Sequence, residues 1–338
     1  MSRAGSRSQS EPATQQSLAE ALSALCTELG IPVEQMLHTV EAALALAYKR
    51  AFNPDGDVTV RLDTTTGALD VRSRIVKDGH VEEKELPSDD FKRMAAQTAK
   101  HAVLRHIHDL ERDKVLRDVA EHKGELASGV VDRIENGTVY VDLGRAEGVM
   151  PPEEQIPGEQ VIPGRPLLIV ILDAEHNRKQ AQVRVSRASR AFVHRLLEAE
   201  VPEIKAGTVQ VRAIAREPGL RTKVAVSSTE PGLDPVGACV GPKGVRHRAI
   251  LSELVGEHVD IVPWSEDPEH FVAAALGPAK VDKVTIDRVT RTATVMVPKN
   301  QLSLAIGRDG QNARLAAKLT GLRIDIKPSE GDAEPPPG

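Results

Sequence analysis

Two short stretches of this chain set a basic side chain inside a Gly-x-x-Gly sequence: Gly241-Pro-Lys-Gly244 and Gly307-Arg-Asp-Gly310. Glycine has no side chain, so a phosphate group can approach the backbone closely. The free N–H groups and the positive dipole end of a helix that follows such a loop point at the same anion. The chemistry that these residues favour is therefore the non-covalent binding of a phosphate backbone.

The candidate binding residues are the two loops and the polar side chains in the first turns after them. Lys243 and Arg308 lie between the glycines, where each adds a positive charge. Asp309 adds a negative charge, so we expect the second loop to bind phosphate less strongly, and Pro242 removes one N–H donor from the first loop. The full set is Gly241, Pro242, Lys243, Gly244, Arg246, Arg248, Gly307, Arg308, Asp309, Gly310, Gln311, Asn312 and Arg314.

The Gly-x-x-Gly sequence alone carries little weight, because 25 glycines in 338 residues produce about two matches by chance. Its context carries more. Residues 234–248 and 300–314 share a capping residue (Asp234 or Asn300), an apolar helical segment, the loop, and a second helix with Arg at its fourth position. Predicted strands precede and follow each copy, at 209–214, 223–226 and 259–263, and at 281–286, 293–297 and 324–328.

The order strand, strand, helix, loop, helix, strand thus occurs twice and resembles that of a KH domain. The Gly-x-x-Gly loop of that domain clamps about four nucleotides of single-stranded RNA through their backbone. The alternative is a glycine-rich turn with solvated basic residues, and for one isolated copy that alternative would be favoured. Two copies in register favour a pair of RNA-binding domains.

The segment between residues 124 and 191 alternates apolar and polar residues, and its five predicted short strands fit an OB-type barrel. Asn136-Gly137 is a strong signal for a type I′ hairpin. Residues 124–131 and 139–151 resemble an S1-type OB domain, a type that usually stacks bases on surface aromatics. Tyr140 is the only aromatic residue of the segment, which is also acidic, so a spacer or protein-docking role is favoured over RNA contact. The strands are predicted at 125–134, 138–143, 147–150, 167–172 and 180–185.

The N-terminal third predicts a small α/β domain. Its second helix is expected to start at Pro32, which suits a first turn, and to end near Asn53. A long helix, capped by Ser88 or Asp89 and roughly 45 Å in length, should connect this domain to the barrel. The elements are helices at 17–29, 32–53 and 90–119, strands at 58–62 and 68–75, and a polar stretch at 77–86. The apolar positions expected to pack the long helix on the earlier ones are Phe91, Met94, Ala95, Val103, Ile107, Leu110 and Leu116.

Charge is distributed unevenly along the chain. The whole chain carries a net charge of -5, yet residues 205–330 carry +4, which fits a mildly basic RNA-binding module after acidic domains. Cys26 and Cys239 lie far apart in apolar helical surroundings and are expected to be buried thiols in a reducing compartment. No signal peptide is visible and the longest apolar run is far too short for a membrane helix. A cytoplasmic protein is expected.

Sequence motifs of enzymes are not found. No Walker loop, nucleophile elbow or zinc spacing occurs. His101, His106 and His108 are expected on the surface of the long helix, and adjacent carboxylates such as Glu82-Glu83 do not converge on one point. Trp264 is expected in the core. We therefore expect no catalytic residue, metal or cofactor.

Several segments resemble the NusA family of bacterial transcription elongation, termination and antitermination factors. The second loop region reads Ala305-Ile-Gly-Arg-Asp-Gly-Gln-Asn-Ala-Arg-Leu-Ala316 and is similar to a KH segment of that family, and the resemblance extends over roughly residues 17–328. Other segments that carry it are 234–241, 260–268, 41–49, 98–102 and 201–204.

The resemblance implies a multidomain α+β protein: an α/β N-terminal domain with a long connecting helix, an S1-type OB β-barrel and two tandem type II KH domains. It also implies docking on core RNA polymerase near the RNA exit, where the barrel and KH domains hold single-stranded nascent RNA, including ribosomal RNA leader sites, and modulate pausing, termination and antitermination. Other Nus factors are further candidate partners, and a monomer is expected. The expected boundaries are a disordered tail at 1–16, the polymerase-binding domain at 17–123, the S1 domain at 124–200, the KH domains at 201–276 and 277–328, and a disordered tail at 329–338.

Two alternatives use the same modules. RNA-degrading enzymes of the polynucleotide phosphorylase type place KH before S1, after a large catalytic core, whereas here the order is reversed and no such core is found. A ribosome-bound or assembly factor is less firmly excluded. Co-purification with polymerase or with ribosomal subunits distinguishes the two functions.

Overall fold

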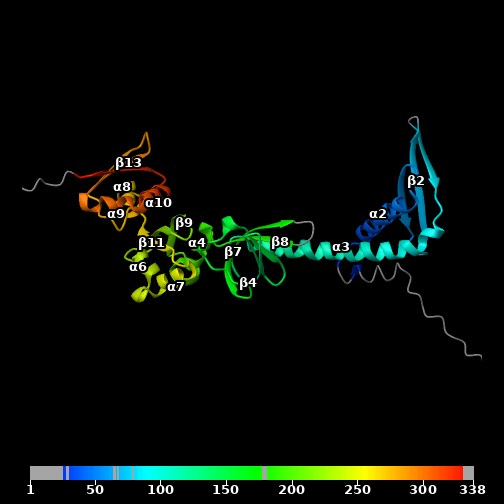
Figure 1. The fold of residues 1–338 in the computed structure, drawn as a ribbon, viewed down its shortest axis with the longest axis horizontal. Coiled ribbons are helices and arrows are strands. Elements are labelled where there is room, and N and C mark those ends of the chain that lie inside the picture. The colour runs from blue at the N-terminus through cyan, green and yellow to red at the C-terminus, as the bar shows by residue number, and fades with distance from the viewer. Residues whose placement is uncertain are drawn as a thin grey trace, which may run out of the picture. The chain divides into compact units, whose positions relative to one another are not determined.

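The computed structural model describes residues 26–27, 30–63, 66, 68–77, 80–176 and 181–329. It divides into two compact units, Met1–Asp113 and Lys114–Gly338, and Figure 1 labels many of their elements. The expected helix at 17–29 and the two expected tails lie outside the described residues, except for Cys26, Thr27 and Ser329.

The first unit packs helices against a three-stranded antiparallel sheet in the order β1-β2-β3. Helix α2 (Val33–Phe52) buries one residue per turn, and these side chains meet the sheet and the first half of α3 (Lys92–Glu121) in one apolar cluster. The strands are β1 (Asp57–Leu62), β2 (Leu69–Lys77) and β3 (His80–Glu85), followed by the 3₁₀ turn η1 (Asp89–Phe91). The buried residues of α2 are Met36, Val40, Leu44 and Tyr48.

Four details of this unit differ from the sequence prediction. Strand β3 occupies the expected polar stretch; all six of its residues are exposed at the sheet edge, so no apolar alternation marks it. Pro32 is the N-cap of α2 and not its first turn. Ser88 makes no side-chain cap, and the carboxylate of Asp89 instead accepts a hydrogen bond from Lys92 at 2.7 Å. Met94 is 37% exposed, where packing was expected.

The second unit begins with a closed barrel of five strands, β4-β5-β6-β8-β7, which confirms the predicted OB-like architecture. Asn136 and Gly137 both have positive φ (50° and 81°), as a type I′ turn requires. Ile169 and Ile171 point into the barrel, and Val170 between them packs outside it against the helix α4 (Arg190–Glu200). The strands are β4 (Leu126–Glu135), β5 (Thr138–Asp142), β6 (Glu147–Met150), β7 (Pro166–His176) and β8 (Ala181–Ser186).

Two similar α+β domains follow, and each has a three-stranded sheet with one antiparallel and one parallel pairing. The first comprises β9 (Val209–Glu217), β10 (Arg221–Ser228), α6 (Pro235–Val240), α7 (Val245–Glu253) and β11 (His258–Pro263). The second comprises β12 (Lys283–Asp287), β13 (Thr292–Val297), α9 (Leu302–Ile306), α10 (Gln311–Thr320) and β14 (Arg323–Pro328). The predicted order of elements therefore occurs twice.

Helices outside the repeat, which the sequence reading did not include, join these parts. Helix α4 and the short α5 (Pro202–Lys205) share one apolar cluster with the barrel and the first domain of the repeat. Helix α8 (Pro268–Ala275) shares another with both domains of the repeat. The central strand β10 is consequently buried on both faces: Val224 and Val226 face the first cluster and Ala225 faces the second.

Buried polar groups reinforce the junction of the barrel with the first domain of the repeat. Arg187, 2% exposed, binds the carboxylate of Glu159 through two nitrogens (2.6 and 2.9 Å) and the carbonyl of Glu253 at 2.7 Å. Arg216 and Glu257, buried beside it, are 2.9 Å apart and use further bonds to neighbouring groups. Such pairs avoid a large desolvation cost only when their remaining donors and acceptors are satisfied, so this junction has a defined geometry.

Candidate nucleic-acid interface

The two Gly-x-x-Gly loops have the same backbone conformation. Gly241 has φ 73° and ψ 172°, and Gly307 has φ 77° and ψ 170°. Lys243 and Asp309, two residues later, both lie in the left-handed region with φ 53° and 51°. Few non-glycine residues adopt this conformation, so its occurrence at equivalent positions indicates that the two copies share one loop structure.

The first glycine of each loop has no room for a side chain. A Cβ on Gly241 would lie 2.7 Å from Cγ of Arg246, and one on Gly307 would lie 2.8 Å from the backbone nitrogen of Asn312. At Gly310, the last glycine of the second loop, a Cβ would meet nothing within 4 Å. Each loop thus closes against the helix that follows it, while the second loop is open on its outer side.

The loop side chains and the fourth residue of each following helix are exposed. Arg308 is 96% and Asp309 89% exposed, and Lys243 and Arg248 are exposed as well. Arg248 donates a hydrogen bond to the carbonyl of Lys243 at 2.7 Å, and Arg314 donates one to the carbonyl of Asp309 at 3.2 Å. Each arginine therefore binds the loop backbone through one guanidinium nitrogen, and its other N–H groups lie outside the loop.

Arg246 and Asn312, two more predicted site residues, face inward. Arg246 donates to the carbonyl of Ala238 at 2.6 Å and to the carboxylate of Glu203 at 2.9 Å. Asn312 is 1% exposed and donates to main-chain carbonyls at Leu276 (2.9 Å), Ala305 (3.0 Å) and Leu304 (3.4 Å). These contacts support the shape of the loops, and RNA contact by either side chain stays a prediction.

Gln311 and Arg314 extend toward the other domain of the repeat. Both donate to the carboxylate of Glu217 at the end of β9: Arg314 through two nitrogens at 2.6 and 3.1 Å, and Gln311 at 3.1 Å. Lys318 lies 3.6 Å from the same carboxylate. Hydrogen bonds from Arg314 first, then from Gln311, lower the pKa of Glu217 to about 2 despite its partial burial.

Glu217 and Lys318 were not identified from the sequence. Glu217 lies 94 to 101 positions before its partners in the sequence, and Lys318 lies outside the loop motif. No local pattern indicates a contact between the two domains of the repeat. Of the two capping residues predicted for the repeat, one is confirmed and the other is wrong. Asp234 caps α6 by accepting from the N–H of Val236 at 3.0 Å, but Asn300 lies inside the turn η4 (Lys299–Gln301) and caps nothing.

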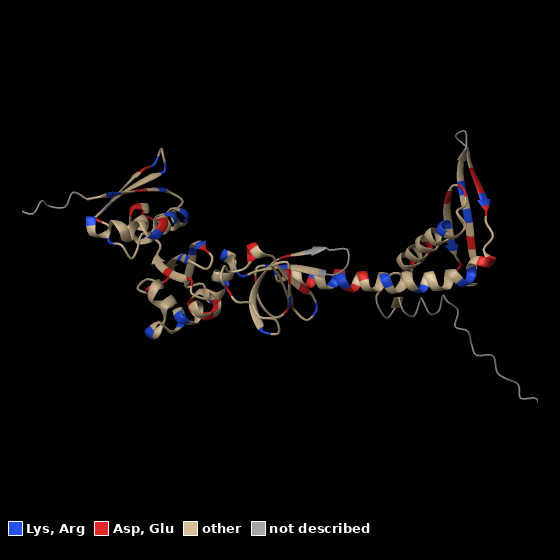
Figure 2. Ribbon diagram, viewed as in Figure 1, with Lys and Arg blue, Asp and Glu red and all other residues tan. Residues whose placement is uncertain are grey.

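The charges around the two loops differ. In the described part of the chain, no carboxylate lies within ion-pair distance of Lys243 or Arg248. Arg314, the counterpart of Arg248, is paired with Glu217, and Arg308 lies 3.8 Å from Asp309. Lys and Arg occur on helices and strand ends of both domains, with Asp and Glu between them (Figure 2). The first loop therefore presents the less compensated positive charge.

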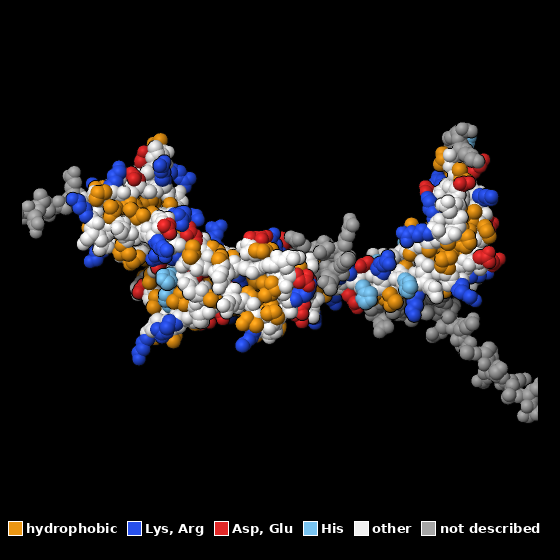
Figure 3. Space-filling model, viewed as in Figure 1, with side chains coloured by type: hydrophobic (Ala, Val, Ile, Leu, Met, Phe, Trp, Pro, Cys, Tyr) orange, Lys and Arg blue, Asp and Glu red, His pale blue; other side chains and the backbone are white. Residues whose placement is uncertain are grey.

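The barrel offers few stacking surfaces. The guanidinium of Arg133 lies 3.9 Å from the ring centroid of Tyr140 and is itself held by carboxylates of Asp132, Glu135 and Glu147. One face of this ring is thus already covered. Val130, Ile134 and Ile162 are 44–52% exposed, and hydrophobic side chains gather on the face of the barrel that Figure 3 shows. These features fit protein docking better than base stacking.

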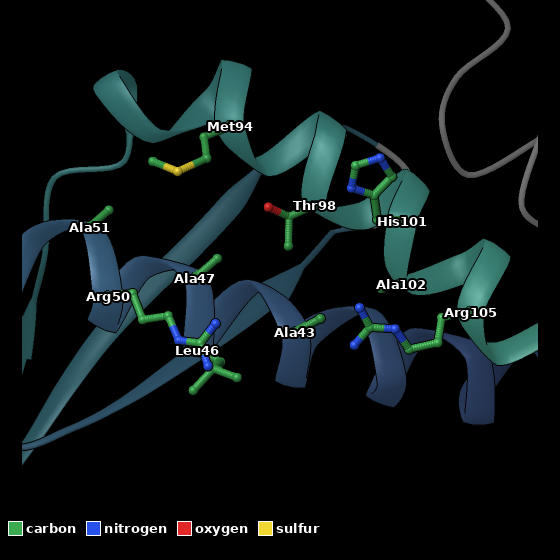
Figure 4. Close-up of a pocket in the computed structure, with 10 residues that line it drawn as sticks. All are labelled: Ala43, Leu46, Ala47, Arg50, Ala51, Met94, Thr98, His101, Ala102 and Arg105. Atoms are coloured by element: carbon green, nitrogen blue, oxygen red, sulfur yellow. The ribbon is translucent and has the colours of Figure 1, made fainter. Parts of the chain in front are cut away.

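A hollow of about 430 Å³ lies between α2 and α3 in the first unit. Alanine side chains of both helices form much of its lining, Leu46 and Met94 lie at its edge, and Arg50 and Arg105 extend over it from opposite helices (Figure 4). Leu46 is 53% exposed. The hollow is therefore an apolar recess with a basic rim, which suits a protein partner more than a small polar substrate.

The remaining candidates carry no site. Cys26 and Cys239 are buried and unpaired, as predicted, and Trp264 packs against the apolar cluster between the domains of the repeat. Within the described ranges, no group of three or more His, Cys, Asp or Glu side chains is arranged to hold a metal ion. No described helix is both long and apolar enough to cross a membrane.

The sequence is similar to known proteins of one family. Three family models match: the NusA N-terminal domain over residues 17–83, the NusA-like first KH domain over 187–264 and the NusA-like second KH domain over 268–334. The chain is 43% identical to the transcription termination/antitermination protein NusA of Bacillus subtilis, over 94% of this chain and 91% of that protein. It is 40% identical to the protein of that name from Mycobacterium tuberculosis (94% and 94%) and 36% identical to that from Thermus thermophilus (92% and 89%).

Proposed function

Since the chain belongs to the NusA family of transcription termination/antitermination proteins, we propose that it is an RNA-binding transcription factor. It docks on RNA polymerase and holds nascent RNA, and in this way modulates pausing, termination and antitermination. The single observation that supports RNA binding most directly is the pair of Gly-x-x-Gly loops with nearly equal backbone angles, each followed by a helix. Such loops clamp the backbone of single-stranded RNA.

The RNA contacts fall into two groups in this proposal. Lys243, Arg248 and Arg308 are exposed and supply the positive charge, and the backbone of residues 241–244 and 307–310 supplies the close approach. Arg246 and Asn312 support the loops from behind. Pro242, Asp309, Gln311 and Arg314 adjust the strength of binding at the edges of the two loops.

The first unit supplies the docking surface for polymerase in this proposal. Its apolar recess between α2 and α3, with arginines at the rim, can take a protein segment with apolar and acidic side chains. Docking raises the concentration of the RNA-binding domains around the emerging transcript, so that a modest intrinsic RNA affinity suffices. Ribosomal RNA leader sites are among the expected RNA targets, and other Nus factors are candidate partners.

The remaining properties follow from the same reading. The protein acts without catalysis or cofactor, as a monomer, in the cytoplasm. Its domains are the polymerase-binding domain at 17–123, the barrel at 124–200, and the KH domains at 201–276 and 277–328. The barrel, with its covered tyrosine and exposed aliphatic residues, contributes to protein contacts more than to RNA affinity.

The test separates the two activities in the full-length chain. Lys243→Glu with Arg248→Glu should weaken binding of a fluorescein-labelled single-stranded RNA by at least about tenfold, because two cations near the phosphates become anions. Pull-down of core RNA polymerase should stay at the wild-type level. Lys283→Glu with Arg288→Glu makes the same charge change on exposed residues of β12 and its turn, and should have a much smaller effect.

Two results would overturn the proposal. Loss of polymerase binding together with RNA binding in the loop variant would contradict the division of labour. Co-purification of the wild-type protein with ribosomal subunits and not with polymerase would replace the proposal with the ribosomal alternative.

A further inference from the structure

The carboxylate of Glu217 occupies a set of donors on the second domain of the repeat. Glu217 ends β9 of the first domain, and three side chains of helix α10 converge on it: Gln311 at 3.1 Å, Arg314 at 2.6 and 3.1 Å, and Lys318 at 3.6 Å. Its side chain is 16% exposed, whereas that of Arg314 is 48% exposed. The anion is therefore enclosed by these donors, while the guanidinium still reaches solvent.

Beside the first loop, the described carboxylate Glu203 pairs with Arg246 at 2.9 Å and not with the equivalent of Arg314. Arg248 is the counterpart of Arg314: each is the fourth residue of the helix after the loop, and each donates to the carbonyl of the loop's third residue. Among the described residues no carboxylate pairs with Arg248. Two sites with the same backbone thus differ in whether their arginine is neutralised.

The arrangement around Glu217 is of the kind that guanidinium groups use for phosphate. Two parallel N–H···O bonds bind a carboxylate or a phosphate equally well in geometry. We propose that Glu217 is an internal counterion that sets the RNA affinity of the second loop, because it holds Arg314, Gln311 and Lys318 away from the RNA backbone. The inference rests on the proposed RNA-binding function. It assigns to a residue outside both loops a role in the strength of RNA binding.

A purely structural role for Glu217 is the competing explanation, and the domain contacts argue against it. The two domains of the repeat already share an apolar cluster that includes Val262, Phe271 and Leu315. Lys223, which is fully buried in the first domain and bonded there to Asp260 (3.0 Å), also donates to the carbonyl of Gly277, which follows α8 (2.8 Å). Removal of one charge at the edge of this contact should therefore leave the domains together and release the cations of α10.

The experiment compares Glu217→Gln with wild type in the full chain, with a fluorescein-labelled unstructured RNA long enough to cover both loops. The release of one or two cations should tighten binding by about three- to tenfold near physiological salt and steepen the dependence of log K on log salt by about 0.7 to 1.4. Glu269→Gln, on α8, is the matched control: it makes the same charge change on an exposed residue whose side chain has no described ion pair.

A second variant tests whether Arg314 carries the gain. Arg314→Ala should weaken RNA binding little in the wild-type background, where Glu217 holds the guanidinium, and should remove much of the gain in the Glu217→Gln background. Thermal unfolding of each variant shows whether the domains remain folded.

Each outcome has one meaning. If wild type does not bind RNA, the proposed function fails. If wild type binds RNA and Glu217→Gln binds it no tighter than Glu269→Gln does, the counterion role is overturned. RNA binding by Glu217→Gln that is weaker than that of Glu269→Gln would identify Glu217 as a structural contact instead.

Discussion

Arg246 and Asn312 occupy equivalent positions in the two domains of the repeat and make the same contact with different chemistry. Each donates a hydrogen bond to the carbonyl at the end of the preceding helix, Arg246 to Ala238 and Asn312 to Leu304. Each also lies directly against the first glycine of its loop. The shape of both loops therefore depends on the second residue of the following helix. In the first domain this residue is a partly exposed arginine, and in the second it is a buried asparagine.

Replacement of Asn312 should destabilise the protein more than replacement of Arg246. Asn312→Ala removes a buried donor from the carbonyl of Ala305 and one of the two donors of the Leu276 carbonyl, which also accepts from the N–H of Ala279, and this costs about 1–3 kcal/mol. Arg246 is 23% exposed, so water can reach the groups that its removal frees. Chemical unfolding of Asn312→Ala and Arg246→Ala would measure this, and equal losses in the free energy of unfolding would contradict it.

The glycines of the second loop should differ in their tolerance of alanine. Gly307→Ala meets the backbone of Asn312 at 2.8 Å and also requires a positive φ, so it should cost about 2–4 kcal/mol. Gly310→Ala meets nothing within 4 Å and should cost only the strain of a left-handed residue, roughly 1–2 kcal/mol. The midpoints of denaturant unfolding check the difference, and a larger loss for Gly310→Ala would show that the loop packs otherwise.

The third residue of each loop should control the relative strength of the two loops. Asp309→Lys gives the second loop the residue that the first loop has at the same φ (53° and 51°), so the exchange adds little backbone strain. It changes the local charge by two units and should tighten RNA binding by several fold, roughly one or two extra phosphate contacts. The reciprocal Lys243→Asp should weaken binding. Fluorescence anisotropy at two salt concentrations would test both, and an unchanged affinity in both variants would exclude this residue from the RNA contact.

Polymerase docking should depend on the apolar recess of the first unit. Leu46→Glu places a charge at the edge of the hollow, and because Leu46 is 53% exposed the fold should lose little stability. We expect loss of polymerase pull-down with unchanged RNA binding. Val76→Glu is the control, since Val76 is 69% exposed on the sheet of the same unit and does not line the hollow. Equal effects of the two substitutions would exclude the recess as the docking surface.

Acid should remove the stabilising effect of Glu217. Its pKa is lowered to about 2 in the folded protein from an ordinary value of 4.5, so its contribution to stability is present above pH 4.5 and is lost as the pH falls toward 2. Wild type should therefore exceed Glu217→Gln in Tm at pH 6, and the difference should shrink between pH 4.5 and 3. A difference that is constant over this range would show that the carboxylate charge does not stabilise the contact.

The sequence predicted most of the repeat because its signals are local. Two Gly-x-x-Gly loops, two helices with Arg at the fourth position and matching strand ends appear within each copy, and the structure has them in that order. The N-cap at Asp234 was also a local signal, but Asn300 shows its limit, since a short 3₁₀ turn takes the place of a cap there.

What could not be predicted depends on pairing over long distances. Strand β3 has no buried residue of its own and exists because β2 provides an edge for it. Glu217 contacts Gln311 and Arg314 only when both domains of the repeat have packed together. The sequence around each of these residues gives no sign of the contact. The inward orientation of Arg246 and Asn312 likewise follows from the closeness of the loop glycines, which the residue types alone do not reveal.

The apolar cluster that joins Val170 of the barrel to Phe192 of α4 and Val224 of β10 has a consequence for how this part of the chain comes apart. A second cluster continues from Ala225 on the same strand to Leu315 of α10. No part of this series can lose its packing without exposing the core of the next, so the barrel and the two domains after it should melt in a single cooperative transition. A protease that cleaves only opened backbone should accordingly preserve them as one fragment until all of it unfolds.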